Sequence, residues 1–232
     1  MLRSLATKMG GVPFHHWFIT ISKSRNWSTN LVLFTWQKLA PIYLTIFQRK
    51  IKNFMIIMAS SLIGSLLILN KKLIKEILAY SSIFNLRWII MAISLNIKVF
   101  LGFTIIYWIV VILFLLITTK RNTKLIREIE KNLKGKETIL FLISILGGIP
   151  PLIGFLTKWI VFSIALKIII KTICTTMLIL RILNLYTYMR TVSPVLIKRT
   201  TKMQKNTNNS SFNLTWLLVV LNTLMLIVCA TW

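Results

Sequence analysis

Three lysines lie inside long apolar stretches of this 232-residue sequence, where charged side chains are unusual. Lys38 lies in LVLFTWQKLAPIYL, Lys158 in GGIPPLIGFLTKWIVFSIAL and Lys8 in LATKMGGVPFHHWF. A charge at the centre of a bilayer costs about 3 kcal/mol even on a lenient scale. Burial away from water also lowers the pKa of a lysine toward neutrality, where its amine exchanges protons readily. A series of such lysines predicts a proton relay; the alternative is that each one pairs structurally with an acid or a backbone carbonyl.

Two of these lysines lie beside paired glycines and prolines that interrupt a helix. Similar runs occur twice, 137 residues apart, as Gly10-Gly11-Val12-Pro13 and Gly147-Gly148-Ile149-Pro150-Pro151. Proline has no N–H and glycine weakens a helix, so these runs release backbone groups that must face protein or water. Two interrupted helices at corresponding places are typical of inverted-repeat transporters, whose ion sites lie at such breaks.

Other kinds of site find little support in the sequence. The two histidines, His15 and His16, are adjacent and therefore point about 100° apart on a helix. No Asp occurs and no Glu lies near them, which argues against a three- or four-ligand metal site. The glycine pairs lack the strand-to-helix context of a phosphate-binding loop. Cys174 and Cys229 lie in separate apolar segments and are interpreted as buried thiols.

The composition indicates which elements hold these residues. Hydrophobic residues make up 56% of the chain, charged residues 14%, and the mean hydropathy is +0.77. A soluble domain of this length cannot bury so much apolar surface, so the sequence predicts an all-α polytopic membrane protein. Twenty-nine Lys and Arg against four acids give a net charge of +25. No basic face alternates with exposed aromatics, so anionic lipid such as cardiolipin is favoured over nucleic acid as their partner.

About eight transmembrane helices are expected from the apolar stretches and the polar breaks between them. They cover residues 2–20, 29–48, 54–70, 77–96, 99–118, 138–165, 172–190 and 213–231. The first and the sixth contain the glycine–proline runs. Loops on one side of the membrane then hold more than twice as many Lys and Arg as loops on the other. The positive-inside bias places loop 119–137, which has seven of them, in the cytoplasm or the matrix, with both termini opposite.

Four sequence motifs resemble a known family. KMGGVPFHHW (8–17), TWQKLAP (35–41), ILAYSSI (77–83) and LGGIPPLIGFLTKW (146–159) occur in order and at suitable spacing. Together they resemble the chain 2 subunits of animal mitochondrial NADH–ubiquinone oxidoreductase, respiratory complex I. The resemblance covers about residues 5–165, and the second and fourth motifs rarely occur together elsewhere.

This resemblance implies an antiporter-like subunit of the membrane arm, built from two inverted repeats with lysines along a central hydrophilic axis. The family's proton-handling lysines fall on Lys8, Lys38 and Lys158, and its broken helices fall on the two glycine–proline runs. No cofactor is expected in this chain, since FMN, iron–sulfur clusters and ubiquinone belong to other subunits. The implied partners are other membrane-arm subunits, and the implied location is the mitochondrial inner membrane, with loop 119–137 on the matrix side.

The sequence departs from the family pattern mainly in its first half. Family members have further helices before the first motif, one of which carries a buried glutamate that partners the first lysine. The chain is therefore interpreted as lacking those helices, and another chain or a separate N-terminal piece is expected to cover Lys8 and Lys38 with a carboxylate. Arg87 stands where the family usually has glycine, Glu76 takes the second place of a basic pair, and His16 replaces an aromatic.

The sequence is interpreted as a single membrane domain over residues 1–232. Residues 1–96 hold the remnant of the first inverted repeat and the helices after it, 97–190 hold the second repeat with the broken helix 138–165, and 191–232 form a loop and a final helix. The favoured function is a lysine relay for proton translocation, in a non-redox subunit of the H⁺-translocating NADH:ubiquinone reductase. The alternatives are a free-standing cation/proton antiporter of the same superfamily and a structural membrane scaffold.

Overall fold

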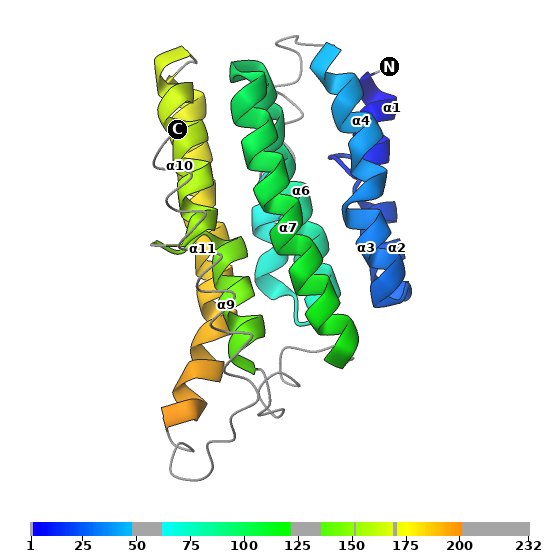
Figure 1. Ribbon diagram of the computed structural model, residues 1–232, viewed down its shortest axis with the longest axis vertical. Helices are drawn as coiled ribbons and strands as arrows, with labels where there is room; N and C mark the ends of the chain where they lie inside the picture. The colour runs from blue at the N-terminus through cyan, green and yellow to red at the C-terminus, as the bar shows by residue number, and fades with distance from the viewer. Residues whose placement is uncertain (1, 48–61, 122–135, 151, 169–170, 201–232) are drawn as a thin grey trace.

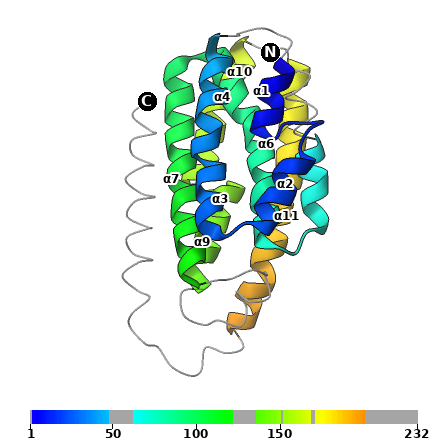
Figure 2. The same ribbon diagram turned by 90° about the vertical axis from the view of Figure 1, so that its right-hand side faces the viewer.

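The computed structural model describes residues 2–47, 62–121, 136–150, 152–168 and 171–200, and nearly all of them are helical (Figure 1). The helices run roughly parallel to one another (Figure 2). In chain order the elements are α1 (Leu2–Met9), α2 (His16–Ser24), α3 (Trp27–Phe34), α4 (Trp36–Phe47), η1 (Ile68–Asn70), α6 (Ile74–Leu95), α7 (Ile97–Arg121), α9 (Lys136–Gly147), α10 (Ile153–Ile168) and α11 (Lys171–Thr200). The expected helix over 213–231 and the part 54–61 of the one over 54–70 lie outside the described residues.

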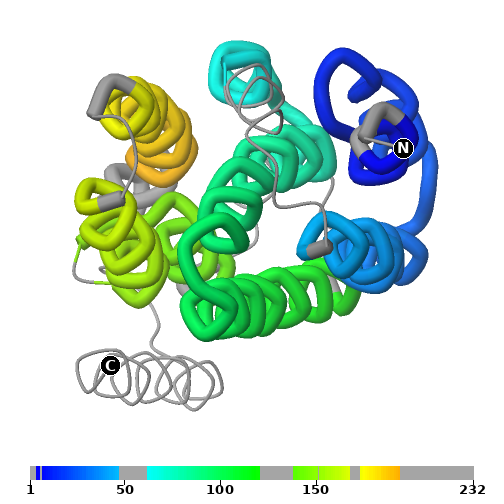
Figure 3. Tube along the Cα trace, turned by 90° about the horizontal axis from the view of Figure 1, so that it is seen from above, coloured from blue at the N-terminus to red at the C-terminus, as the bar shows by residue number. Residues whose placement is uncertain are grey.

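Two of the described helices are long and apolar enough, by length and composition, to cross a bilayer. They are α6 and the stretch Ile97–Lys120 of α7. Nearly every residue of α6 is buried, because α6 lies between the group α1–α4 and the group α9–α11 (Figure 3). A helix enclosed on all sides is expected to be apolar all round, as α6 largely is. Most of the polar residues of α6 are therefore inside the bundle, namely Glu76, Ser81, Ser82, Asn85 and Arg87.

Three of the expected transmembrane stretches are each divided into two helices in the structure. Residues 10–15 separate α1 from α2, and residues 148–152 separate α9 from α10, both at the glycine–proline runs. The stretch 29–48 is divided at Thr35, where there is neither glycine nor proline. Thr35 Oγ1 donates a hydrogen bond to the Leu31 carbonyl at 2.7 Å, and Lys38 N bonds three residues back to the Thr35 carbonyl at 3.2 Å. Such local side-chain and three-residue bonds compete with the regular helix.

The end of α2, the start of α6 and the end of α7 lie at one end of the bundle, the lower end in Figure 1. Glu76, in the first turn of α6, forms an ion pair with Lys23 of α2 at 3.1 Å. At the same end, Arg190 of α11 donates to the Leu69 carbonyl of η1 at 3.2 Å. The start of α9 also lies there (Figure 1). The described loops that were expected on one side of the membrane thus share one end; which compartment that end faces stays a prediction.

Candidate functional site

The first helix break brings an aromatic ring against the backbone. α1 ends at Met9, and Gly10 adopts a φ of +72°, in the left-handed region that favours glycine. A Cβ atom at Gly10 would lie 2.7 Å from the Phe18 ring, so the glycine also permits this close approach. Trp17 of α2 donates its Nε1–H to the Thr7 carbonyl of α1 at 2.8 Å. These contacts pack α2 closely against the end of α1 and thereby position the Phe18 ring.

Lys38 lies over that ring. Its side chain is 1% exposed, and its Nζ atom is 5.0 Å from the Phe18 ring centroid. Within the described part of the chain, Nζ has no hydrogen-bond partner. A cation–π contact contributes about 0.5–2 kcal/mol, whereas burial of an unpaired charge costs several kcal/mol. Phe18 therefore offsets part of the cost of a buried ammonium, and the charge on Lys38 depends on what else approaches it.

Lys8 differs from Lys38 in its surroundings. It lies in the last turn of α1, just before the break, and its side chain is exposed on this chain. Of the neighbouring break residues, Gly11 is buried and Pro13 is exposed. The structure thus places one lysine inside the chain beside the first break and another on its surface.

The second break ends α9 and turns the chain into α10. Gly148, directly after α9, adopts a φ of +73°. A Cβ atom at Gly147 would lie 3.0 Å from the Tyr188 side chain, so this glycine lets α9 pack closely against α11. Pro150 is exposed in the turn, and Pro151 lies outside the described residues. The break releases carbonyl groups at the end of α9 from the helical pattern.

Lys158 uses one of these carbonyls. Its side chain is 4% exposed, and its Nζ donates a hydrogen bond to the Leu146 carbonyl at 3.1 Å. In a continuous helix this carbonyl would accept from the residue four places on, but that residue is Pro150, which has no N–H. A Cβ atom at Gly148 would lie 3.5 Å from Nζ, which places the amine against the break itself. The proline thus leaves the Leu146 carbonyl free to accept a hydrogen bond from the buried amine of Lys158.

The helix α6 holds the two buried lysines apart. α4, which carries Lys38, and α10, which carries Lys158, pack on opposite sides of it (Figure 3). α6 also carries buried polar side chains, among them Ser81 and Asn85. The Asn85 side chain interacts with the Tyr107 phenol of α7. Both α6 and α7 contact helices of the two halves, so these buried side chains lie between the two lysines.

Two further buried cations, which the sequence did not assign to a site, lie near Lys158. Arg87 of α6 is 0% exposed and Arg181 of α11 is 7% exposed. Arg87 Nη2 donates a hydrogen bond at 3.0 Å to the carbonyl of Met177, one turn before Arg181. The three charges are close enough to repel one another. Both arginines lie inside expected transmembrane stretches in the sequence. The criterion that selected the lysines, a charged residue within an apolar stretch, would have selected these arginines too.

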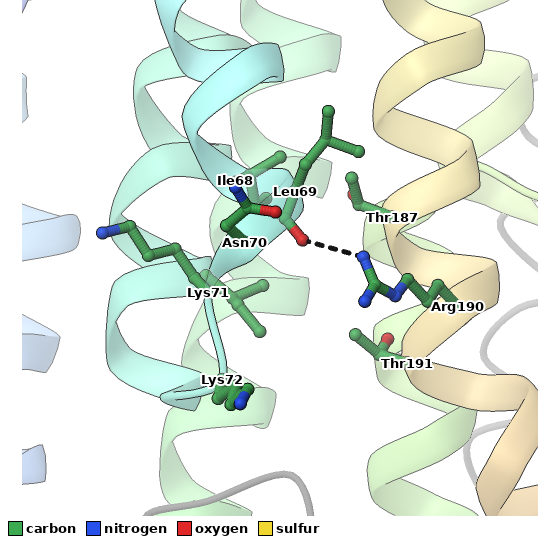
Figure 4. A pocket seen from close by; sticks show the side chains of 9 residues that line it. Ile68, Leu69, Asn70, Lys71, Lys72, Thr187, Arg190 and Thr191 are labelled. Atoms are coloured by element: carbon green, nitrogen blue, oxygen red, sulfur yellow. Dashed lines mark hydrogen bonds between the residues drawn. The ribbon is translucent and has the colours of Figure 1, made fainter.

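A separate cavity of about 370 Å³ opens at the basic end of the bundle (Figure 4). Figure 4 shows Arg190 reaching from α11 toward the Leu69 carbonyl beside this cavity. With Lys71 and Lys72, Arg190 gives the rim a positive charge, which suits an anionic head group. The cavity is lined by Ile68, Leu69, Asn70, Lys71, Lys72, Ile77, Thr187, Arg190 and Thr191.

A helical bundle with buried lysines beside interrupted helices is the architecture of antiporter-like membrane subunits. A family model described as "NADH:quinone oxidoreductase/Mrp antiporter, TM" matches residues 1–183. The chain belongs to this transmembrane family, and the resemblance seen in the four motifs is confirmed.

Curated relatives carry the name NADH-ubiquinone oxidoreductase chain 2. The chain is 31% identical to the one from Locusta migratoria over 196 residues, which is 82% of this chain and 57% of the relative. It is 33% identical to the one from Cyprinus carpio over 229 residues, which is 92% of this chain and 66% of the relative. The chain thus spans between about half and two thirds of the length of these relatives.

Solved structures share the fold. A chain of respiratory complex I from Thermus thermophilus matches with a TM-score of 0.74 at 20% identity, over 84% of this chain and 48% of that one. A chain of an archaeal membrane-bound sulfane sulfur reductase matches with a TM-score of 0.77 at 16% identity, over 98% and 51%. The Mrp complex from Dietzia sp. DQ12-45-1b gives 0.63 at 17% identity, over 82% and 40%. The bundle is therefore a fold found in multi-subunit membrane complexes.

Proposed function

We propose that this chain is a non-redox, proton-translocating subunit of the membrane arm of NADH:ubiquinone oxidoreductase in the mitochondrial inner membrane. The observation that carries the proposal is Lys158, a buried amine bound to a carbonyl that a helix break releases. Lys38, buried against the corner of the first break, supports it as a second site of the same kind. The names of the relatives supply the host enzyme.

In this proposal Lys158 and Lys38 take up and release protons, while electrons pass through other subunits that hold FMN, iron–sulfur clusters and ubiquinone. An ammonium at Lys158 donates more strongly to the Leu146 carbonyl than a neutral amine does. Each proton transfer therefore changes both a hydrogen bond and a full charge inside the chain. In a medium of low dielectric constant such a change acts over several ångströms. The buried polar groups of α6, such as Asn85, are proposed to pass protons between the lysines.

Lys8 is proposed to meet a neighbouring chain of the assembly. Its exposed ammonium would otherwise face lipid, which costs about 3 kcal/mol at the bilayer centre. A carboxylate from the neighbour stabilises the charged form if it lies within about 6 Å. A structure of the whole assembly tests this proposal. If lipid covers Lys8 and no carboxylate is near, only Lys38 and Lys158 are kept as proton-relay residues.

The basic end of the bundle is proposed to bind anionic lipid such as cardiolipin at the rim of the cavity in Figure 4. The test is the cardiolipin that co-purifies with the assembly. Combined Lys72→Gln and Arg190→Gln substitutions should lower it. Lys98→Gln at the start of α7, at the other end of the bundle, is the control and should leave it unchanged. Equal loss in both variants would contradict a site at this cavity.

The host enzyme is tested by the particle with which the chain purifies. A complex I subunit co-migrates on a native gel with a large NADH-oxidising assembly. A free-standing cation/proton antiporter, the alternative that the likeness to the Mrp complex favours, migrates without that activity. A structural scaffold would co-migrate, but proton pumping by its host would survive neutralisation of Lys38.

A further inference from the structure

Three buried cations lie on three helices that pack together: Arg87 on α6, Lys158 on α10 and Arg181 on α11. Arg87 Nη2 bonds to the Met177 carbonyl, and Met177 lies four residues before Arg181 on the same helix face. The Arg181 Cζ atom lies 4.6 Å from the ring centroid of Phe155, which is one turn before Lys158 on α10. The two guanidinium groups and the ammonium therefore occupy adjacent turns of three packed helices.

In the part of the chain that the structure describes, no carboxylate is placed to balance these charges. The sequence has four acids and no Asp. Glu76 is engaged at the basic end of the bundle by Lys23 and Lys71. Glu137 lies ten residues before Gly147 on α9, about 15 Å along the helix axis. The other two, Glu128 and Glu130, lie outside the described residues.

The two arginines keep donors without an acceptor in the described part of the chain. Arg87 Nε and Nη1 and Arg181 Nη2 are buried and have no hydrogen-bond partner there. The Arg87 guanidinium lies over Phe84, with Cζ 3.8 Å from the ring centroid, and Nη2 is its only nitrogen with an acceptor in the described part of the chain. Arginine does not lose its proton in proteins, so the cluster carries at least two positive charges whatever the state of Lys158. Buried charge of this size needs a counter-charge.

We propose that a small monovalent anion of chloride size binds between Arg87 and Arg181 and accepts hydrogen bonds from their free N–H groups, next to Lys158. The guanidinium edge is the protein group best suited to such an acceptor. Because Arg87 is completely enclosed by its own chain, a small ion fits the site better than the side chain of a neighbouring subunit. The bound anion also compensates part of the charge that Lys158 adds when it is protonated. The proposed anion site is inferred from these buried cations alone and does not depend on the proposed proton relay.

Bromide provides the test, because its anomalous X-ray scattering identifies the ion. The native assembly is crystallised in sodium bromide, and an anomalous peak is expected between Arg87 and Arg181. The Arg87→Gln assembly should lack that peak, whereas Arg190→Gln, on the same helix as Arg181 but at the exposed end, should keep it. A carboxylate of a neighbouring chain in contact with both guanidinium groups, or the absence of any peak in the native assembly, would overturn the proposal.

Thermal inactivation gives a second readout that needs no crystal. The inactivation midpoint of the native assembly should rise and saturate when chloride replaces the larger gluconate at constant ionic strength. Arg181→Gln should lose this rise, and Arg190→Gln should retain it. If Arg87→Gln fails to assemble, Arg181→Gln and Arg87→Lys serve in its place. Equal midpoints in chloride and gluconate for the native assembly would contradict a bound small anion.

Discussion

At the scale of single residues, the two buried lysines have different partners. Lys158 bonds to a backbone carbonyl, and Lys38 lies over the face of an aromatic ring. Their depth in apolar stretches identified both in the sequence. The partnership of Lys158 with Arg87 and Arg181 could not be predicted in this way, because like charges on separate spans give no sign of meeting. Only the packing of three helices brings them together.

The close packing beneath Lys38 predicts that Gly10→Ala is destabilising. A residue with a Cβ atom costs about 1–2 kcal/mol in the left-handed region, and that atom would overlap the Phe18 ring. The measurement is the thermal midpoint of the assembled complex, which should fall. Gly102→Ala in α7 is the matched control, since a Cβ atom there meets nothing within 4 Å and alanine favours a helix by about 1 kcal/mol. Equal midpoints in the two variants would show that Gly10 is not constrained.

At the scale of elements, glycine and proline are the residues from which helix ends could be predicted in the sequence. The described helices stop at both glycine–proline runs, where the backbone pattern cannot continue. The division at Thr35 has no comparable sign. Thr104 and Thr118 make the same hydrogen bond to a carbonyl four residues back, yet α7 continues through both. A threonine bond therefore ends a helix only where the tertiary packing also favours it, and a sequence does not display that packing.

The missing N–H of Pro150 predicts a specific effect of Pro150→Ala. Alanine supplies an amide four residues after Leu146, and this amide competes with Lys158 Nζ for the carbonyl. NADH-driven proton uptake should fall in a complex that still assembles. In a Lys158→Met background the same substitution should have no further effect, because the competition is gone. A fall of the same size in both backgrounds would mean that Pro150 acts in some other way.

At the scale of the whole molecule, composition predicted a helical membrane bundle, and the alternation of the expected spans predicted which loops lie at the same end. The order of the helices around α6 could not be predicted, because apolar faces of similar composition can pair in many ways. Local fits decide that order, such as Gly147 of α9 against Tyr188 of α11. The central place of α6 also explains why its buried polar residues, such as Ser81 and Asn85, lie between the two halves of the bundle.

The charge bias predicts that loop 119–137, most of which lies outside the described residues, faces the matrix. Its seven Lys and Arg would be costly to translocate. Protease added to sealed, right-side-out mitoplasts should spare this loop, and detergent should expose it. Rapid cleavage before detergent is added would reverse the topology.

The central claim is that Lys158 carries protons, and Lys158→Met tests it most directly. Methionine keeps the length of the side chain and removes its charge and its bond to Leu146. NADH-driven proton uptake by vesicles containing the assembled complex should fall to a small fraction of the native rate. NADH oxidation by an artificial acceptor should continue, and Lys98→Met, at the exposed start of α7, should pump normally. Unchanged pumping in an assembled Lys158→Met complex would contradict the relay and leave Lys158 with a structural role.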